Sequence, residues 1–168
     1  MPHTLAEQLT KYLTVTELAG RPPVRLFGGA VYLVAVRNSG AAFSLGTNYT
    51  FVFPVVAVIV IGWIVWMATR LRSLGWAFAL GLVMGGALGN LTDRLFRAPG
   101  PLLGHVVDMV SLFDDAGRVW PVFNAADSAL FAGVLLLVVL ELTGRRRDGT
   151  QVSARTTPST DRDSSAGT

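Results

Sequence analysis

The stretch FVFPVVAVIVIGWIVWMAT, residues 51–69, decides the fold because it carries no charge over a length that can cross a lipid bilayer. The uncharged region begins as early as Asn38. Across the whole chain of 168 residues the mean hydropathy is +0.50 and only 15% of the residues are charged. Such a composition is too apolar for an ordinary soluble domain, so the sequence predicts a small membrane protein.

Two further apolar stretches, residues 74–92 and 122–142, predict additional membrane helices. Between them, residues 94–121 are predicted to be a polar connection, because they contain the turn-forming sequence Pro-Gly-Pro. Together with residues 51–69, these stretches predict an all-α polytopic membrane bundle of three spans within residues 51–142.

Arginines beside the predicted spans indicate their orientation. Arg70 and Arg72 follow the first span, and Arg145–Arg147 follow the third. Basic residues next to spans concentrate on the cytoplasmic side, so the opposite helix ends are predicted to be extracytoplasmic. The tail, residues 143–168, is rich in Ser, Thr, Asp and Arg and is predicted to be disordered and cytoplasmic. Three spans leave the polar N-terminal segment, residues 1–23, outside, which suggests that an earlier membrane helix is missing.

A small extracytoplasmic β element is predicted for residues 24–50. Residues 25–37 are rich in β-forming residues and too short to span a membrane. The sequence Asn-Ser-Gly at 38–40 is a turn signal that closes this element.

Two aspartates lie in apolar surroundings. Asp108 interrupts the run VVDMV, and Asp127 stands near the head of the third predicted span. A charged side chain at membrane depth costs roughly 2.5–3.5 kcal/mol on insertion scales, so a function is expected. Two close carboxylates share a proton, and one can act as a base toward water while the other donates to a scissile carbonyl. The structural alternatives are that Asp127 caps its helix and that Asp108 is a loop residue near Arg118.

Three glycines repeat every four residues along the second predicted span and predict a face for close helix packing: Gly81, Gly85 and Gly89. Asp93 continues this stripe, so it is predicted to point into the bundle; its structural alternative is an ion pair with Arg94 or Arg97. Further polar residues converge on the extracytoplasmic side of the predicted topology, and together they suggest one site there: Asn38, Asn90, Arg94 and Asn124.

Several functions are disfavoured by composition. The chain has no Cys, which excludes disulfides and thiol catalysis. Its two histidines, His3 and His105, are not at the sequence spacing typical of metal ligands, so neither a metal nor another cofactor is predicted. The arginines and the single Lys11 form no basic stripe interleaved with aromatic residues, so nucleic acid is not a predicted partner.

Four blocks of this chain closely resemble blocks of the bacterial lipoprotein signal peptidase (signal peptidase II) family, in the same order over roughly residues 5–142. The blocks are NSGAAF at 38–43, GGALGNLTDR at 85–94, GHVVD at 104–108 and FNAADS at 123–128.

The resemblance implies a membrane aspartyl peptidase of the bacterial cell membrane. Such an enzyme removes signal peptides from prolipoproteins just before a diacylglyceryl-modified cysteine, without a metal, at the extracytoplasmic side. Its implied partners are these substrates and membrane lipid. Asp108 and Asp127 match the catalytic pair, and residues 24–50 resemble an extracytoplasmic β-cradle. The implied supporting residues are Asn38, Gly40, Asn90, Asp93, Arg94, Asn124 and Lys11.

The chain departs from the family in three ways. The family has four spans, and the first is not visible here. The family carries an Asp and, four residues later, a Lys near the end of that span, where this chain offers Glu7 and Lys11. Residues 113–119 suggest a longer loop. Two other functions remain open: a proton-coupled transporter or channel subunit, which would also use intramembrane carboxylates, and a non-catalytic paralogue that binds lipoprotein precursors.

Overall fold

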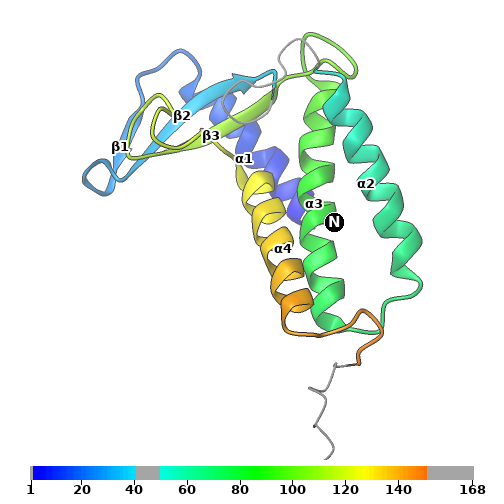
Figure 1. Cartoon of the computed structure of the whole chain (residues 1–168). Helices are drawn as coiled ribbons and strands as arrows, with labels where there is room; N and C mark the ends of the chain where they lie inside the picture. The colour runs from blue at the N-terminus through cyan, green and yellow to red at the C-terminus, as the bar shows by residue number, and fades with distance from the viewer. Residues whose placement is uncertain (1, 41–49, 151–168) are drawn as a thin grey trace, which may run out of the picture.

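The computed structural model describes residues 2–40 and 50–150. Helices and strands alternate along this part of the chain (Figure 1). Their order and bounds are α1 (Pro2–Leu18), β1 (Val24–Leu26), the 3-10 turn η1 (Phe27–Gly29), β2 (Val31–Asn38), α2 (Val52–Ala68), α3 (Leu74–Phe96), β3 (Val106–Leu112) and α4 (Ala125–Leu142).

The helices α2, α3 and α4 lie side by side, and the sheet projects from the end of the bundle at which α3 terminates (Figure 1). The core between these helices is apolar and includes Ile64, Trp76, Leu80 and Leu140. The structure moves two predicted boundaries, since α3 runs on to Phe96 and α4 begins at Ala125. With these two changes, the structure contains the helical bundle and the small β element that the sequence predicted.

The outer surfaces of α2 and α4 are apolar as well. Val58, Ile59 and Phe131 are each more than half exposed. Helices that are apolar on every side are typical of membrane spans. Among the described residues, α3 and α4 are long and apolar enough to cross a membrane, whereas α2 has 17 residues, about 26 Å of helix. The predicted count of three spans is therefore not established by helix length.

Close packing of α3 on α4 depends on glycines other than those predicted. A Cβ atom on Gly86 would collide with the backbone oxygen of Ala126, and one on Gly133 would lie 2.8 Å from that of Ala79. A Cβ on Gly81 or Gly85 would meet nothing within 4 Å among the described residues. The predicted packing face is confirmed only at Gly89, where a Cβ would collide with the Glu7 carboxylate of α1. The contact with α4 is instead made by Gly86, on the neighbouring face of α3.

Residues 94–121 are not merely a polar connection, because they contain strand β3. The sheet order is β1-β2-β3, antiparallel throughout. Val36 pairs with Asp108 and Asn38 with Val106. Side chains two residues apart on a strand share a face, so Asn38 and Asp108 lie on the same face of the sheet.

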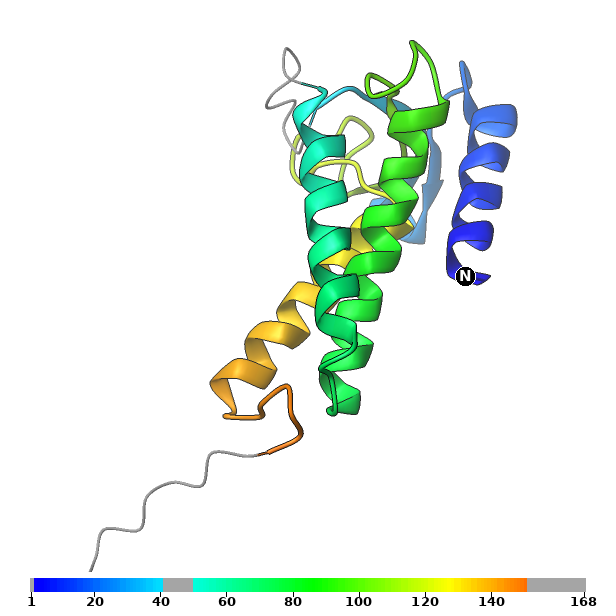
Figure 2. The ribbon, with the colours of Figure 1, turned by 90° about the vertical axis from the view of Figure 1, so that its right-hand side faces the viewer.

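Helix α1 forms within residues 1–23, for which the sequence suggested only a polar segment. Its buried face is formed by Glu7, Lys11 and Thr14, which follow helical spacing and are at most 7% exposed. Helix α1 contacts α3, β2 and β3, and Figure 2 shows it beside the part of α3 nearest the sheet. The apolar periodicity that marks most helices is replaced here by a polar face.

The chain after α4 keeps a defined course to residue 150, in place of the disorder predicted from residue 143. The N–H groups of Arg72 and Ser73 donate to the carbonyl of Arg147, at 3.0 and 3.2 Å. The rest of the predicted tail, and the part of the predicted β-cradle at residues 41–49, lie outside the described residues.

Candidate active site

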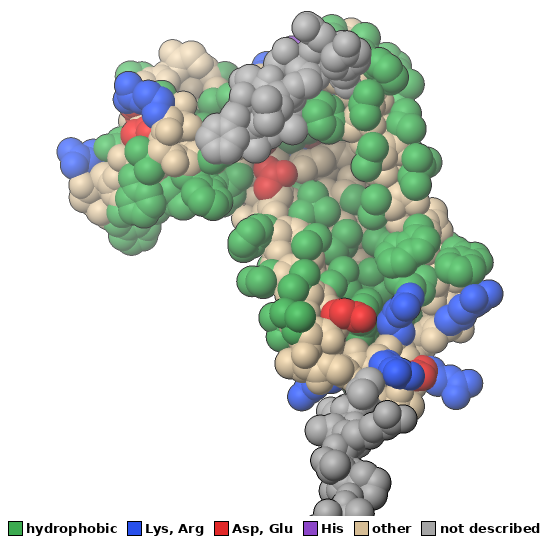
Figure 3. All heavy atoms as spheres, viewed as in Figure 1, with side chains coloured by type: hydrophobic (Ala, Val, Ile, Leu, Met, Phe, Trp, Pro, Cys, Tyr) green, Lys and Arg blue, Asp and Glu red, His purple; other side chains and the backbone are tan. Residues whose placement is uncertain are grey.

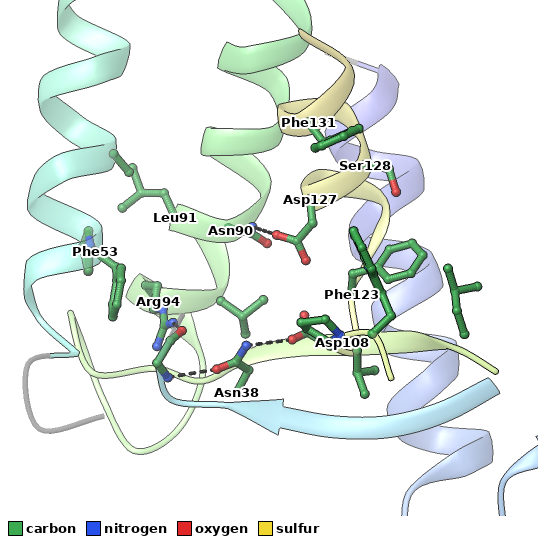
Figure 4. A pocket seen from close by; sticks show the side chains of 18 residues that line it. Asn38, Phe53, Asn90, Leu91, Arg94, Asp108, Phe123, Asp127, Ser128 and Phe131 are labelled. Carbon is green, nitrogen blue, oxygen red and sulfur yellow. Dashed lines mark hydrogen bonds between the residues drawn. The ribbon is translucent and has the colours of Figure 1, made fainter. Parts of the chain in front are cut away.

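A cavity of about 720 Å³ opens between α2, α3, α4 and the sheet (Figure 4). Its wall is mostly apolar and includes Phe53, Trp120, Phe123 and Phe131. The polar residues on the wall are Asn38, Asn90, Arg94, Asp108, Asp127 and Ser128. Both predicted catalytic aspartates therefore line one cavity.

Asp108 reaches the cavity from β3 and is 2% exposed. Its Oδ2 accepts a hydrogen bond from Asn38 Nδ2 at 2.9 Å, and its Oδ1 accepts one from Asn124 Nδ2 at 2.7 Å. The pKa of Asp108 is raised to about 6, chiefly by burial and also by the nearby Asp127 carboxylate, while the hydrogen bonds from Asn38 and Asn124 oppose the increase. Asp108 is thus suited to hold a proton.

Asp127 lies in the first turn of α4 and is partly exposed to the cavity. Its Oδ1 accepts a hydrogen bond from Asn90 Nδ2 at 2.8 Å, and its Oδ2 accepts one from the backbone N–H of Asn124 at 3.1 Å. In return, the N–H of Asp127 donates to Asn124 Oδ1 at 3.0 Å. This reciprocal pair is a capping box, with Asn124 as the N-cap residue.

The capping box fixes the orientation of the Asn124 amide. The oxygen of this amide accepts from the Asp127 backbone, so its NH₂ group must face Asp108 and Asn90. Asn124 Nδ2 donates to Asn90 Oδ1 at 3.2 Å. Asn90 is fixed in the same way, because its oxygen accepts from Asn124 and from Lys11 Nζ at 3.2 Å. The Asn90 NH₂ group is therefore directed at Asp127, as Figure 4 shows. Through Asn90 and Asn124, a chain of amides joins the two carboxyl groups.

Behind this wall lies a buried network of charges. Asp93, fully buried, accepts hydrogen bonds from Lys11 Nζ at 2.9 Å, from Arg97 Nε at 2.6 Å and from the backbone N–H of Val107 at 3.1 Å. Lys11 Nζ also lies 2.6 Å from Glu7 Oε1. These contacts tie α1, α3 and β3 together. Of the two partners considered for Asp93, Arg97 is confirmed and Arg94 is not.

Arg94 bonds to backbone carbonyl groups. Its guanidinium donates to Ser39 O at 2.9 Å, Gly104 O at 3.2 Å and Gly40 O at 2.7 Å. The Gly40 N–H in turn donates to Asn38 Oδ1 at 2.9 Å. Arg94 therefore holds the chain that follows β2 against the segment that precedes β3.

The structure corrects both structural alternatives for the aspartates. Asp108 is a strand residue bonded to asparagines, and Arg118 instead lies 4.0 Å from Asp114 and 3.5 Å from Asp115. Asp127 does belong to the helix start, but as the third helical residue and not as the N-cap.

All predicted polar residues meet at or behind the cavity, whereas its aromatic wall was not predicted. Phe53, Phe123 and Phe131 sit in stretches where apolar residues are ordinary, so nothing in their sequence context distinguishes them from lipid-facing residues. Within residues 2–40 and 50–150, no three His, Cys, Asp or Glu side chains are arranged to hold a metal ion.

Two solved structures share this fold, and both are described as bacterial membrane enzyme structures determined by the in meso method. The one at 2.3 Å resolution aligns with a TM-score of 0.73 and 25% identity, over 91% of this chain and 90% of the other. The one at 1.9 Å resolution aligns with a TM-score of 0.68 and 27% identity, over 83% and 87%. The fold is therefore that of a membrane enzyme.

The family model described as Signal peptidase (SPase) II matches residues 3–143. The lipoprotein signal peptidase of Mycolicibacterium smegmatis is 50% identical over 84% of this chain, and that of Rhodococcus jostii is 52% identical over 85%. The chain spans 61% of the length of the first relative and 70% of the second. The chain belongs to the signal peptidase II family, which is a family of proteases.

Proposed function

We propose that the chain is a membrane aspartyl endopeptidase that removes signal peptides from prolipoproteins, cutting just before a diacylglyceryl-modified cysteine. The observation that carries this proposal is the placement of Asp108 and Asp127 on one wall of a largely apolar cavity. Family membership and the lipoprotein signal peptidase relatives support the same reaction.

In this mechanism the pair holds one proton, which resides on Asp108. The Asp127 carboxylate takes a proton from a water molecule, and the oxygen of that water attacks the carbonyl carbon of the scissile peptide bond. Asp108 donates its proton to the carbonyl oxygen, which gives a neutral tetrahedral intermediate. When the C–N bond breaks, the proton on Asp127 passes to the departing amine, and the hydroxyl proton of the intermediate returns to Asp108.

The supporting residues act on the two acids by position. Asn124 and Asn90 keep both carboxyl groups turned toward the cavity, and Asn38 bonds the second oxygen of Asp108. Lys11 and Asp93 hold Asn90 and β3 from behind. Arg94 holds Gly40 beside Asn38, so it maintains the sheet end of the cavity.

The apolar character of the cavity suits a lipid-bearing substrate. Phe53 and Phe131 stand on the helices whose outer surfaces are apolar, so an acyl chain can reach the cavity wall from the membrane. We place α2, α3 and α4 across the bacterial cell membrane as three spans, with the sheet and the aspartates at the extracytoplasmic side. The exposed arginines at the opposite end of the bundle support this orientation.

The experiment that tests this proposal is a gel-shift cleavage assay on a diacylglyceryl-modified prolipoprotein in detergent. The parent is compared with Asp108→Asn and Asp127→Asn, and Asp114→Asn is the control because Asp114 accepts N–H bonds in a separate loop. We expect cleavage by the parent and the control and loss of cleavage in both active-site variants. Cleavage by either of these variants would refute the proposed pair, and an inert parent would favour a precursor-binding role.

A further inference from the structure

Five arginines gather at the end of the bundle opposite the candidate active site: Arg70, Arg72, Arg145, Arg146 and Arg147. All five are exposed, and none makes an ion pair with a residue that the structure describes. The acidic residues in the same segments are Glu141 and Asp148, and Asp148 is bonded to Thr150. This end of the molecule therefore carries a local excess of positive charge. We call these five residues the arginine cluster.

The two chain segments that carry the arginine cluster are held together by backbone hydrogen bonds. The carbonyl of Arg147 accepts from the N–H groups of Arg72 and Ser73, and the carbonyl of Arg145 accepts from Trp76 Nε1 at 2.8 Å. A turn closes the second segment, because Arg146 N–H donates to the carbonyl of Thr150 at 2.8 Å. The guanidinium groups thus project from a defined surface that joins the α2–α3 loop to the end of α4.

Large apolar side chains border the arginine cluster. Arg70 stacks over the ring of Trp66 at 4.4 Å from its centroid, and Trp66 is 56% exposed. Leu74 and Leu142, in the same region of the chain, are 89% and 81% exposed. Figure 3 shows the basic side chains at this end of the bundle next to the apolar surface of the helices. Such a boundary matches the interface between acyl chains and headgroups of a bilayer.

Two other ligand classes fit this boundary less well. A nucleic acid could bond to the guanidinium groups through its phosphates, but it would leave Leu74 and Leu142 in water. A soluble acidic protein would leave the neighbouring leucines and tryptophans in water. An anionic phospholipid matches both the basic and the apolar part of this boundary. Its phosphate can bond to the guanidinium groups while its acyl chains cover the apolar side chains.

We propose that the arginine cluster is a binding surface for the headgroups of anionic phospholipids, with a lipid phosphate bridging the α2–α3 loop and the segment after α4. This inference rests on the membrane placement given under Proposed function. It does not depend on the catalytic chemistry, because the cluster lies at the opposite end of the bundle from the aspartates (Figure 1).

The test measures which lipids the purified chain retains. The chain is exposed in detergent to equal amounts of phosphatidylglycerol and phosphatidylcholine, and the bound lipids are counted by native mass spectrometry. The cluster variant carries Arg70→Gln, Arg72→Gln, Arg145→Gln and Arg146→Gln, and retains Arg147, whose side chain contacts Met67 and Trp76. The control variant removes the same charge from the sheet end by Arg21→Gln, Arg25→Gln, Arg37→Gln and Arg118→Gln.

We expect the parent and the control variant to retain phosphatidylglycerol preferentially, and the cluster variant to lose about tenfold or more of that preference, since each basic residue near anionic lipid contributes on the order of a fivefold gain. An unchanged preference in the cluster variant, equal loss in both variants, or no preference in the parent would overturn the proposal. Cleavage of prolipoprotein in detergent, measured on the same samples, reports the proposed function separately.

Discussion

Charged side chains at the two ends of α3 differ in burial and in pairing. At the end near the sheet, Asp93 is fully buried and bonded to Lys11 and Arg97. At the other end, Arg70 and Arg72 are exposed and pair with no acid among the described residues. A buried charge must be paired within the protein, whereas an exposed charge at a membrane boundary can be paired by something outside it.

This difference suits the two ends of α3 to different roles. At the buried end, hydrogen-bond donors orient Asp93, Asp108 and Asp127, which suits chemistry that depends on position. The exposed end has basic groups with no ion-pair partner among the described residues, which suits binding to a ligand outside the chain. The predictions below alter one end and leave the other unchanged.

The largest effect is expected from the reacting groups at the buried end. Asp127→Asn removes the base that activates water and keeps the shape of the side chain, so cleavage should fall by about 10³-fold or more. The measurement is the initial rate of prolipoprotein cleavage, with lipid retention at the arginine cluster as the control. A variant that keeps a tenth of the parent rate would show that Asp127 is not the base.

Removing the buried ammonium should destabilise the protein strongly. Lys11→Met keeps the length of the side chain but leaves Glu7 and Asp93 without their shared cation, so the free energy of unfolding should fall by about 3–5 kcal/mol. The measurement is thermal unfolding in detergent. The matched control is Arg21→Met, which breaks an exposed ion pair with Glu17 and should have little effect. Equal effects of the two substitutions would contradict the distinction between buried and exposed charge.

Two glycine substitutions compare a position of α3 beside the buried charges with a position that faces open space. A Cβ at residue 89 would collide with the Glu7 carboxylate, so Gly89→Ala should lower the free energy of unfolding by about 1–3 kcal/mol. Gly85→Ala, where a Cβ meets open space, should be neutral or slightly stabilising because alanine favours helix.

The double variant Gly89→Ala with Glu7→Asp identifies the cause. Shortening the acid by one methylene withdraws its carboxylate from residue 89, so part of the lost stability should return. Additive losses in the double variant would show that the collision is not with Glu7.

The smallest effect concerns pH. Asp108 is protonated below its raised pKa of about 6, so cleavage should decline as the pH rises through about 6 and this proton is lost. Asn38 donates to Asp108 and favours its charged form. Asn38→Leu should therefore raise the pKa of Asp108 and move the alkaline limb of the kcat/KM profile to higher pH. A shift to lower pH would contradict the role assigned to Asn38.

Hydropathy predicted the bundle, and the short polar blocks predicted the residues that meet at the cavity. The strand β3 was missed because a strand depends on pairing with distant residues, here those of β2. The helix α1 was missed because its buried face consists of Glu7, Lys11 and Thr14, which an apolar period cannot reveal. The packing role of Gly86 depends on which face of α3 meets α4, and the spacing of glycines does not specify that face.

Asn124 has a consequence for which side chains its position can accept. Helix N-caps are usually Ser, Thr, Asp or Asn, and any of these could receive the Asp127 N–H. Asn124 must also donate two hydrogen bonds, to Asp108 and to Asn90. Aspartate has no proton to give when ionised, and serine and threonine have one. Among the usual N-cap residues only asparagine meets both requirements, so a library of all twenty amino acids at residue 124, screened for prolipoprotein cleavage, should return asparagine.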